Sequence, residues 1–345
     1  MGAHGNGALT RPRTAPAEEA FTGLPAGERA LLRRAALPAT VEPMRAVLTE
    51  ARFSDPAWVF ERKLDGIRCI AIVSGRDVRL RSRNDLSLDE RFPEIVAALA
   101  AAQLPDAVLD GEIVAFSGDQ TSFERLQQRS AGGVAVFLYV FDLLHLAGRD
   151  TTSLPLSARR QLLSAAIPFA GPIQLVASEP REGERLYAEA CEKGWEGLIA
   201  KRAGAPYTHG RSRDWLKFKC TAEQELVIGG YTAPQGSRTD LGALLLGHFD
   251  DGRLRYAGKV GTGFTRETLR ELAALLAPLR RKTTPFADGV REPRVTWVEP
   301  RLVAQIGFSE WTRDGRLRHP RFLGLRDDKS AAEVVREASQ VVREA

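Results

Sequence analysis

The stretch that decides the fold is ERKLDGIR, residues 61–68, with Lys63 near its centre. It is strongly charged, yet it lies between the apolar residues Trp58-Val59-Phe60 and the apolar run CIAIV at 69–73. Surface loops are often charged, but a buried strand seldom follows one directly. A lysine at this junction therefore indicates a site where charge is needed inside the fold.

Length and composition are those of a water-soluble chain of roughly two domains. Of 345 residues, 43% are hydrophobic and 27% charged. No apolar run approaches the ~18 residues that span a bilayer, and the N-terminus lacks an apolar signal core, so we expect no membrane partner. Cys69, Cys191 and Cys220 form no CxxC pair, which argues against a zinc knuckle or disulfide framework and favours a reducing cytoplasm. The five histidines show no metal-ligand spacing.

Apolar runs separated by turn and helix-ending residues predict a mixed α/β region that ends at residue 221. Residues 1–20 are rich in Gly, Ala, Pro and Arg and are predicted to be disordered, and 21–37 to form a helix that Pro38 stops. RCIAIVSG and DVRLRSR are typical of a hairpin, and PEIVAALAAA of a helix opened by Pro93. Further strands are predicted in AVLDGEIVAF, VAVFLYVFDLL, IQLVAS, EGLIAKR and WLKFK, and helices in SARRQLLSAAI and EGERLYAEACEKG.

The pattern changes at residue 222. Short strands with Gly and Asp turns, and one helix in RETLRELAALLAPLRR, predict a small β-barrel of the OB type over 222–330. This region holds 18 Lys and Arg against 14 Asp and Glu, within a net charge of +5, which suits a polyanionic partner. Residues 331–345 are predicted to form a C-terminal helix.

The residues around Lys63 form the pattern K-x-D-G-x-R, and ordered companions follow it. They are Glu112 in LDGEIVAF, Phe141 in YVFDLL, Glu196 and Lys201 in EGLIAKR, Lys217 and Lys219 in WLKFK, and Arg326, Asp328 and Lys329 in LRDDK. Lys217 and Lys219 are two apart on a strand, so they face the same side.

With these motifs the sequence resembles the ATP-dependent DNA ligases of the covalent nucleotidyltransferase superfamily, in particular bacterial ligase C and the ligase domain of ligase D. The resemblance covers about 41–330. It implies an α/β (α+β) adenylation domain, of the nucleotidyltransferase, ATP-grasp-like kind, over 21–221, followed by the OB-fold domain over 222–330. No segment fits the polymerase and phosphoesterase domains of a ligase D, so a stand-alone, monomeric ligase is expected.

The resemblance implies three nucleotidyl transfers: from ATP to a lysine, from the lysine to a DNA 5′-phosphate, and displacement of AMP by a 3′-hydroxyl. Lys63 matches the nucleophile. Because an amine attacks when deprotonated, we expect the cations Lys217, Lys219 and Arg68 to lower the pKa of Lys63 and to hold phosphate oxygens. Asp65 is expected to orient the lysine or a metal-bound water.

The resemblance also assigns the nucleotide and metal contacts. Mg²⁺ or Mn²⁺ would be held by Glu112 and Glu196, with Glu112 alternatively holding the ribose hydroxyls. Phe141 and Ile199 are expected on the two faces of adenine, and Glu61 at its edge, chiefly through backbone. Arg83, in RSRND, resembles the arginine of the family's SRxG element, whose usual glycine is here Asp85 or absent. Arg83 and Arg213 are expected near the nucleotide. Arg326 and Lys329 match the OB motif that meets the β- and γ-phosphates on closure, about a hinge at 219–225. Lys259 is a further DNA or phosphate candidate.

The implied substrate is nicked or broken duplex DNA, with an end-binding repair protein as a possible partner. Two other readings stay open. An RNA ligase or capping enzyme would share the Lys63 chemistry and differ in nucleotide or acceptor. A catalytically silent nucleic-acid-binding protein would have lost site residues, whereas the lysines and glutamates above are all present. An NAD-dependent ligase would bring a four-cysteine zinc site, which this sequence lacks.

Overall fold

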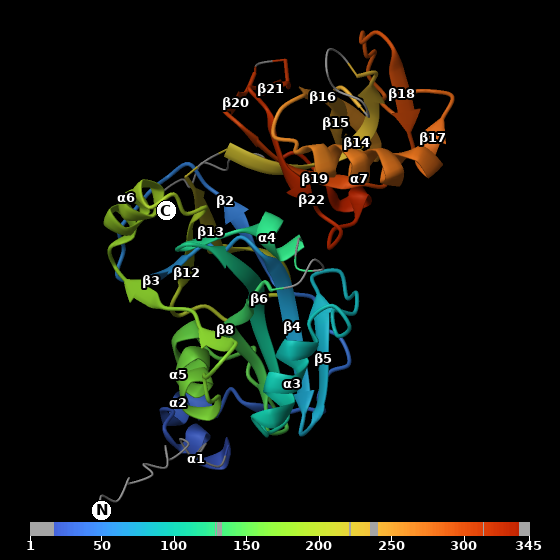
Figure 1. Cartoon of the computed structure of the whole chain (residues 1–345). Helices are drawn as coiled ribbons and strands as arrows, with labels where there is room; N and C mark the ends of the chain where they lie inside the picture. Colours follow the sequence, from blue (N-terminus) through green and yellow to red (C-terminus); the bar gives the residue numbers. More distant parts are fainter. Residues whose placement is uncertain are drawn as a thin grey trace, which may run out of the picture.

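The computed structural model describes residues 17–127, 129, 133–220, 222–234, 241–312 and 314–337. Figure 1 shows a larger lower part, built from the chain up to β13, and a smaller upper part that begins with β14. Strand β22 of the upper part lies beside helix α4 (Phe123–Gln127) of the lower part (Figure 1). No helix in the described residues is both long and apolar enough to span a membrane.

The lower part contains two sheets. The eight-stranded sheet has the order β1-β9-β8-β6-β4-β5, with β10 beside β8 and β7 beside β6. Its strands are β1 (Arg33–Arg34), β4 (Ile67–Ser74), β5 (Asp77–Ser82), β6 (Ala107–Ser117), β7 (Gln120–Thr121), β8 (Val136–Leu146), β9 (Arg149–Asp150) and β10 (Ile173–Leu175). The five-stranded sheet has the order β11-β3-β12-β13-β2, with β2 (Met44–Leu48), β3 (Trp58–Arg62), β11 (Ser178–Pro180), β12 (Gly197–Arg202) and β13 (Gly210–Lys219).

Helices cover the outer faces of these sheets, and apolar side chains fill the space between the layers. Helices α3 (Pro93–Ala101) and α5 (Leu156–Ala166) bury Ile95, Leu99 and Leu162 against the larger sheet. Helix α6 (Gly183–Glu192) packs on the smaller sheet, over Phe60 and Phe218. A third apolar cluster joins the two sheets to each other and includes Met44, Ile70, Val108, Phe141, Tyr207 and Trp215.

The upper part is the OB-fold domain. Its sheet has the order β16-β15-β14-β18-β17, and β19 pairs with both β14 and β22. The strands are β14 (Ala222–Thr232), β15 (Leu244–Asp250), β16 (Arg253–Val260), β17 (Arg280–Arg281), β18 (Val295–Val298), β19 (Val303–Phe308) and β22 (Arg321–Leu325), with the small hairpin β20 (Glu310–Trp311) and β21 (Leu317–Arg318). Helix α7 (Arg266–Leu276), capped by the Thr265 hydroxyl, buries Leu269, Leu272 and Leu276 in this core.

The predicted hairpin and the helix opened by Pro93 are confirmed. Strands β4 and β5 pair from Cys69 opposite Ser82 to Ser74 opposite Asp77, and α3 begins at Pro93. The predicted helix over 21–37 is wrong. The chain forms α1 (Ala17–Thr22) and α2 (Ala26–Arg29), and β1 then joins the sheet beside β9. Pro25 stands between the helices, where its ring breaks a continuous helix.

Both predictions for the chain termini need correction. Residues 17–20 of the predicted disordered segment are helical and Ala20 is buried, while 1–16 lie outside the described residues. The predicted helix over 331–345 is wrong for 331–337: after the short turn η3 (Ala331–Glu333) the chain is extended, and Val335 bridges to Phe249 of β15. Burial of Val334 in the OB domain competes with helix formation. Residues 338–345 lie outside the described part.

A disulfide joins Cys191 of α6 to Cys220 at the end of β13, with Cα atoms 5.2 Å apart. The sequence argued against a disulfide framework, and this bond corrects that expectation for one pair of cysteines. The two residues are 29 apart in the sequence and meet because α6 packs on the sheet that contains β13. Spacing rules that look for neighbouring cysteines do not detect a pair of this kind.

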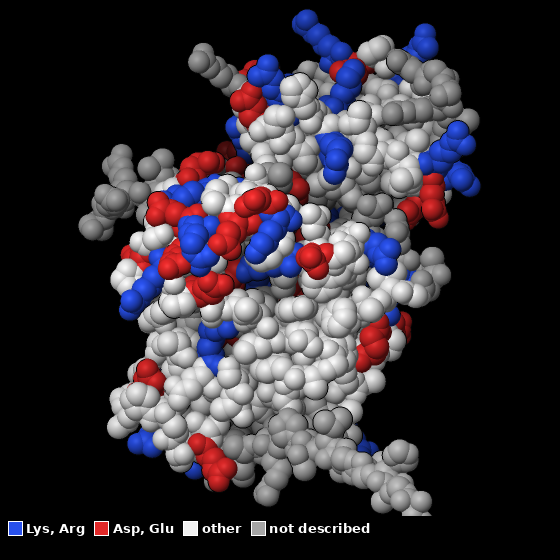
Figure 2. Space-filling model, turned by 60° about the vertical axis from the view of Figure 1, so that its left-hand side comes forward, with Lys and Arg blue, Asp and Glu red and all other residues white. Residues whose placement is uncertain are grey.

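The surface does not carry one continuous basic area on the face shown in Figure 2. Basic and acidic side chains are mixed there, and the lower part of the same face has a wide area without charges (Figure 2). On and beside α6, for example, Arg185 pairs with Glu179, Glu182 and Glu189. Mixed exposed pairs of this type contribute little to stability.

Gly197 is the glycine whose replacement should be most informative. Its φ is +142°, and an added Cβ would lie 1.8 Å from the carbonyl oxygen of Phe218. We expect Gly197→Ala to lower the free energy of unfolding by about 2–3 kcal/mol, from backbone strain and a clash with the neighbouring strand. Urea unfolding would measure this loss.

Gly204→Ala is the matched control, because its Cβ would meet no atom within 4 Å. Its effect should stay within about 0.5 kcal/mol. Equal stability of the two variants would contradict the strain at Gly197.

Candidate active site

The register of the smaller sheet gathers the predicted site residues on one face. Glu61 of β3 lies opposite Ile199 of β12, which lies opposite Lys217 of β13. Side chains that are directly opposite share a face, and so do residues two apart on a strand. Lys63, Lys201 and Lys219 therefore belong to the same face, and all six side chains line one cavity. The opposite face carries the apolar residues that pack under α6.

Lys63 is fixed by its backbone at the end of this face. Its N–H donates to the carbonyl oxygen of Gly197 at 2.9 Å, continuing the pairing of β3 with β12. Glu196 immediately precedes β12, and the Lys63 ammonium donates to Glu196 Oε1. The register that pairs β3 with β12 thus brings a lysine and a carboxylate into contact where these two strands end.

The expected lowering of the Lys63 pKa is wrong for this state of the protein. Burial and Lys219 lower the pKa of Lys63, but the contact with Glu196 outweighs them and the pKa is raised. Lys217 and Arg68 are not among the main causes, and each pairs with another carboxylate, Glu337 and Asp110 respectively. Lys63 must therefore lose a proton that Glu196 holds in place before it can act as a nucleophile.

Lys217 and Lys219 converge on a carboxylate from the far end of the chain. The two oxygens of Glu337 accept from Lys217 and, at 3.2 Å, from Lys219. Burial lowers the pKa of Lys217 to about 8, although Glu337 opposes this effect. Lys219 also donates to the carbonyl oxygen of Glu223 at 2.5 Å. Both lysines and Glu337 line the cavity, so their charged ends meet inside it.

The larger sheet supplies the opposite wall of the cavity. Arg68 of β4 lies opposite Glu112 of β6. The Arg68 guanidinium forms a two-point ion pair with Asp110, at 2.5 and 2.6 Å, and lies 4.7 Å from the ring centroid of Phe141. Arg68 is thus held against the aromatic wall, where its carboxylate partner raises its pKa. Phe141 and Ile199, predicted to cover adenine, both line this cavity.

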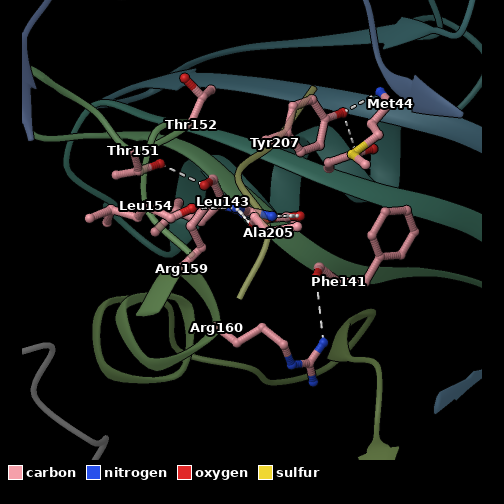
Figure 3. A network of polar contacts seen from close by, with 12 residues as sticks. Met44, Phe141, Leu143, Thr151, Thr152, Leu154, Arg159, Arg160, Ala205 and Tyr207 are labelled. Atoms are coloured by element: carbon pink, nitrogen blue, oxygen red, sulfur yellow. Dashed lines mark hydrogen bonds and ion pairs between the residues drawn. The ribbon is translucent and has the colours of Figure 1, made fainter. Parts of the chain in front are cut away.

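A buried polar layer lies behind Phe141 and fixes its strand. Figure 3 shows Arg159 and Arg160 of α5 reaching toward the loop and strand backbone, and Tyr207 meeting the backbone of Met44. Arg159 is fully buried and pairs with Asp142 at 2.7 Å. Tyr207 donates to Asp110 at 2.6 Å, so this layer extends to the carboxylate that holds Arg68.

The Glu61 carboxylate is also enclosed by cations. It accepts from Arg160 at 2.6 Å, and Lys201 lies 2.6 Å from its other oxygen. The Lys201 ammonium lies 4.1 Å from the Phe141 ring centroid and 4.2 Å from that of Trp215. Burial lowers the pKa of Lys201 despite the nearby Glu61. These contacts make a polar end to an otherwise aromatic part of the cavity.

The donor set fits a divalent cation accompanied by phosphate. Glu196 Oε2 is buried and has no hydrogen-bond partner. Burial raises the pKa of Glu112 to about 7, against the opposing effect of Arg68, Lys63 and Arg326. The described residues contain no cluster of three or more His, Cys, Asp or Glu suited to a metal. One or two carboxylates, completed by water and phosphate, are typical of Mg²⁺.

Asp65 has a structural contact that the sequence did not predict. Its Oδ2 accepts from the N–H of Phe123 at 3.1 Å, at the first turn of α4, and its own N–H donates to the Thr121 hydroxyl oxygen at 3.0 Å. Burial and the nearby Glu196 raise the pKa of Asp65 to about 6. Asp65 also lines the cavity, so it connects α4 to the Lys63 segment.

The OB domain closes one side of the cavity with its last strand and the turn after it. Arg326 forms a two-point pair with Asp328, at 2.8 and 2.9 Å, its guanidinium lies 4.3 Å from the Phe123 ring centroid, and it reaches the Gly66 carbonyl at 3.4 Å. Lys329 pairs with Glu225 of β14. Asp327 pairs with Arg91 of the lower part at 2.7 Å. Arg326 and Lys329 thus enter the cavity from a second domain.

The remaining predicted cations occupy different positions. Arg83 lines both this cavity and a small adjoining one, and burial lowers its pKa. Arg211 and Arg213 are both exposed on β13, but Arg211, which the sequence did not single out, lines both cavities and Arg213 lines neither. Lys259 is about half exposed and pairs with Glu292 at 2.8 Å.

Comparisons with known proteins agree with this geometry. A family model described as ATP dependent DNA ligase domain matches residues 38–219, more than half of the chain, and a second, ATP dependent DNA ligase C terminal region, matches 237–329. The chain belongs to the ATP-dependent DNA ligase family. The matched regions contain the lysines and carboxylates of the first domain and the Arg326 motif of the second.

Relatives and a solved structure extend the comparison. The chain is 39% identical to the multifunctional non-homologous end joining protein LigD of Pseudomonas aeruginosa, over 81% of this chain and 35% of that protein. It is 39% identical to the LigD protein of Mycobacterium tuberculosis, over 84% and 39%. A mycobacterial DNA ligase D complexed with ATP and MES is 36% identical, with a TM-score of 0.64, covering 86% of this chain and 98% of that one. The chain thus spans little more than a third of these curated relatives' length.

Several residues in the cavity, or in the polar layer around it, were given no role from the sequence. Lys201 was noted in EGLIAKR without a role, and it lines the cavity two residues after Ile199. Trp215 also lines the cavity, and Asp110 pairs with Arg68 beside it. Tyr207 and Arg160 come from segments with no motif. Glu337 lies in a segment predicted to be helical, and its sequence gives no signal of a role.

The Tyr207 hydroxyl gives a test of the buried layer. It donates to Asp110 and accepts from the N–H of Met44 at 2.7 Å. We expect Tyr207→Phe to lower the free energy of unfolding by about 1–3 kcal/mol, because both buried groups lose a partner. Urea unfolding would show the loss, and a variant as stable as the parent would rule out this role.

Arg211 and Arg213 make a matched pair for testing which β13 arginine serves the nucleotide. The measurement is the KM for ATP in the covalent attachment of label from α-labelled ATP to the protein. We expect Arg211→Gln to raise this KM by about fivefold, since Arg211 lines the cavity. Arg213→Gln should raise it by less than about twofold. The reverse order would favour the assignment of Arg213 made from the motif.

Proposed function

We propose that this chain is an ATP-dependent DNA ligase that seals breaks in duplex DNA through a lysyl-AMP intermediate on Lys63. The observation that carries the proposal is the convergence of Lys63, Glu196, Lys217 and Lys219 on one cavity, which Arg326 and Lys329 enter from the OB domain. Family membership and the 36% identical mycobacterial structure, described with ATP, support the choice of nucleotide.

In the first step the Lys63 nitrogen attacks the α-phosphorus of ATP. A nitrogen–phosphorus bond forms, the bond to the bridging oxygen breaks, and pyrophosphate leaves with that electron pair. Glu196 Oε1 already accepts a hydrogen bond from the ammonium, so it is the group placed to receive the proton. Lys219, buried beside Lys63, makes the neutral amine more favourable.

The other cations have separate tasks in this proposal. Lys217 and Lys219 would hold α-phosphate oxygens and offset the charge that develops on them. Arg326 and Lys329 would hold the β- and γ-phosphates and orient pyrophosphate for departure, with Arg83 and Arg211 near the same end. Phe141 and Ile199 would enclose adenine, and Glu61 would lie at its edge.

A divalent cation, Mg²⁺ or Mn²⁺, would offset phosphate charge during transfer. Glu112 and the unpartnered oxygen of Glu196 would hold it, and the raised pKa of Glu112 fits a carboxyl that ionises fully when a cation arrives. Glu112 also remains a candidate for the ribose hydroxyls. Asp65 would hold the start of α4 in place against the Lys63 segment.

In the later steps AMP passes to a DNA 5′-phosphate and a 3′-hydroxyl displaces it. The OB domain would turn about 219–225 to grip the duplex, and its basic excess would make binding weaken with salt. The LigD relatives are named for non-homologous end joining, so we include broken ends and an end-binding protein partner in the proposal. We further propose a monomer that acts in the cytoplasm.

Covalent labelling tests the function directly. The protein is incubated with α-labelled ATP and Mg²⁺ and examined after denaturation. We expect label on the wild type, transfer of that label to nicked DNA followed by sealing, and none of either in Lys63→Ala. EDTA should abolish labelling, because phosphate charge would no longer be offset.

Parallel samples with labelled GTP and NAD serve as controls for nucleotide choice. Label from GTP would instead indicate a capping-type transferase. Label that passes to nicked RNA but not DNA would indicate an RNA ligase. A folded protein that takes no label from any nucleotide would refute the enzymatic proposal and favour a silent nucleic-acid-binding protein.

A further inference from the structure

The extended C-terminal segment 334–337 delivers an acidic side chain into the phosphate end of the cavity. Glu337 is held by two lysines at once, and its side chain is 15% exposed. The lysine side chains are 13% and 9% exposed, so the three charges meet in a largely enclosed space. Glu337 lines both the main cavity and the adjoining one, and therefore lies where the two connect.

The segment is attached to the OB domain by specific contacts. The carbonyl oxygen of Val334 accepts from the N–H of Phe249 at 2.7 Å, and Val334 itself is buried in the domain core. Gln224 clamps the next residues, because its amide nitrogen donates to the Val335 carbonyl at 3.0 Å and its amide oxygen accepts from the N–H of Glu337 at 3.1 Å. These bonds fix the backbone from Val334 to Glu337, where the chain enters the cavity.

The contacts made by Glu337 are those that a phosphate would need. Each carboxylate oxygen takes one lysine, Lys217 or Lys219, and a phosphate oxygen pair offers the same acceptors and negative charge to the same ammonium groups. The two lysines also bring the pKa of Glu337 down to about 2, although burial acts in the opposite direction, so it is a carboxylate at working pH. A nucleotide phosphate at Lys217 and Lys219 would face this charge at close range and be repelled.

We propose that the C-terminal segment is an intramolecular occupant of the phosphate subsite, in which Glu337 takes the place of a nucleotide phosphate on Lys217 and Lys219 and must leave when ATP binds. This inference rests on the proposed function for the identity of the phosphate ligand. The segment therefore weakens ATP binding while it keeps the two largely buried lysines paired with a carboxylate.

Glu337→Gln keeps the shape of the side chain and removes its charge. We measure binding of ATP to the full chain in EDTA by calorimetry, where transfer chemistry is absent, and the KM for ATP in Mg²⁺-dependent labelling. We expect affinity for ATP to rise, and KM to fall, by about three- to tenfold. A chain ending at Arg336 should show the same change, and it guards against an effect of the new amide.

Glu310→Gln is the charge-matched control, because Glu310 is exposed and pairs with Arg318 away from the cavity. It should leave ATP affinity at the wild-type value. Unchanged or weaker ATP binding in both Glu337 variants would overturn the inference, and weaker binding would show that Glu337 orders the lysines for the nucleotide. Binding in EDTA separates the two proposals. If the Glu337 variants bind ATP more tightly but the wild type takes no label, the C-terminal segment still occupies the phosphate subsite and the enzymatic function is refuted.

Discussion

The pairing of β3, β12 and β13 is the constraint on which the rest of the site depends. A shift of one residue in any of these strands would turn its cavity-facing side chains into the apolar layer under α6. That layer contains Phe60, Leu198 and Phe218, whose burial fixes the register. The backbone bond from Lys63 to Gly197 continues this pairing beyond β3. Hydrophobic burial on one face of the sheet thus positions the charged groups on the other.

Gathering this many buried cations in one cavity costs free energy unless each cation has an anionic partner. Buried ammonium and guanidinium groups need partners, since an unpaired charge in a largely enclosed site is strongly disfavoured. In this structure each main cation has a carboxylate: Lys63 has Glu196, Lys329 has Glu225, and Arg326 has Asp328. The cavity therefore contains a set of protein carboxylates that pair with its cations. The contact with Glu196 accounts for the raised pKa of Lys63.

The sequence predicted the parts of this site that strand alternation and motif spacing control. The face shared by Lys217 and Lys219, the hairpin of β4 and β5, and the two-domain order follow from local pattern. It could not predict contacts that depend on distant segments meeting. The Lys63 pKa was expected to fall because neighbouring cations are visible in the motifs, whereas the distance from Lys63 to Glu196 is fixed by tertiary pairing. The Cys191–Cys220 bond and the position of Glu337 are missing from the prediction for the same reason.

The C-terminal residues show why helical periodicity was misleading there. AAEVVREASQVVREA has apolar residues at a spacing that suits one helical face, but an isolated helix of this length is marginal in water. Here Val334 enters the OB core and Gln224 takes the backbone bonds that a helix would have made internally. The extended form also places the Glu337 carboxylate between Lys217 and Lys219. Among the described residues, no other carboxylate lies as near to either lysine. Tertiary burial and charge pairing therefore favour the extended form over the helix. The burial of Val334 lies within the OB domain, whereas the pairing of Glu337 with Lys217 and Lys219 joins the two domains.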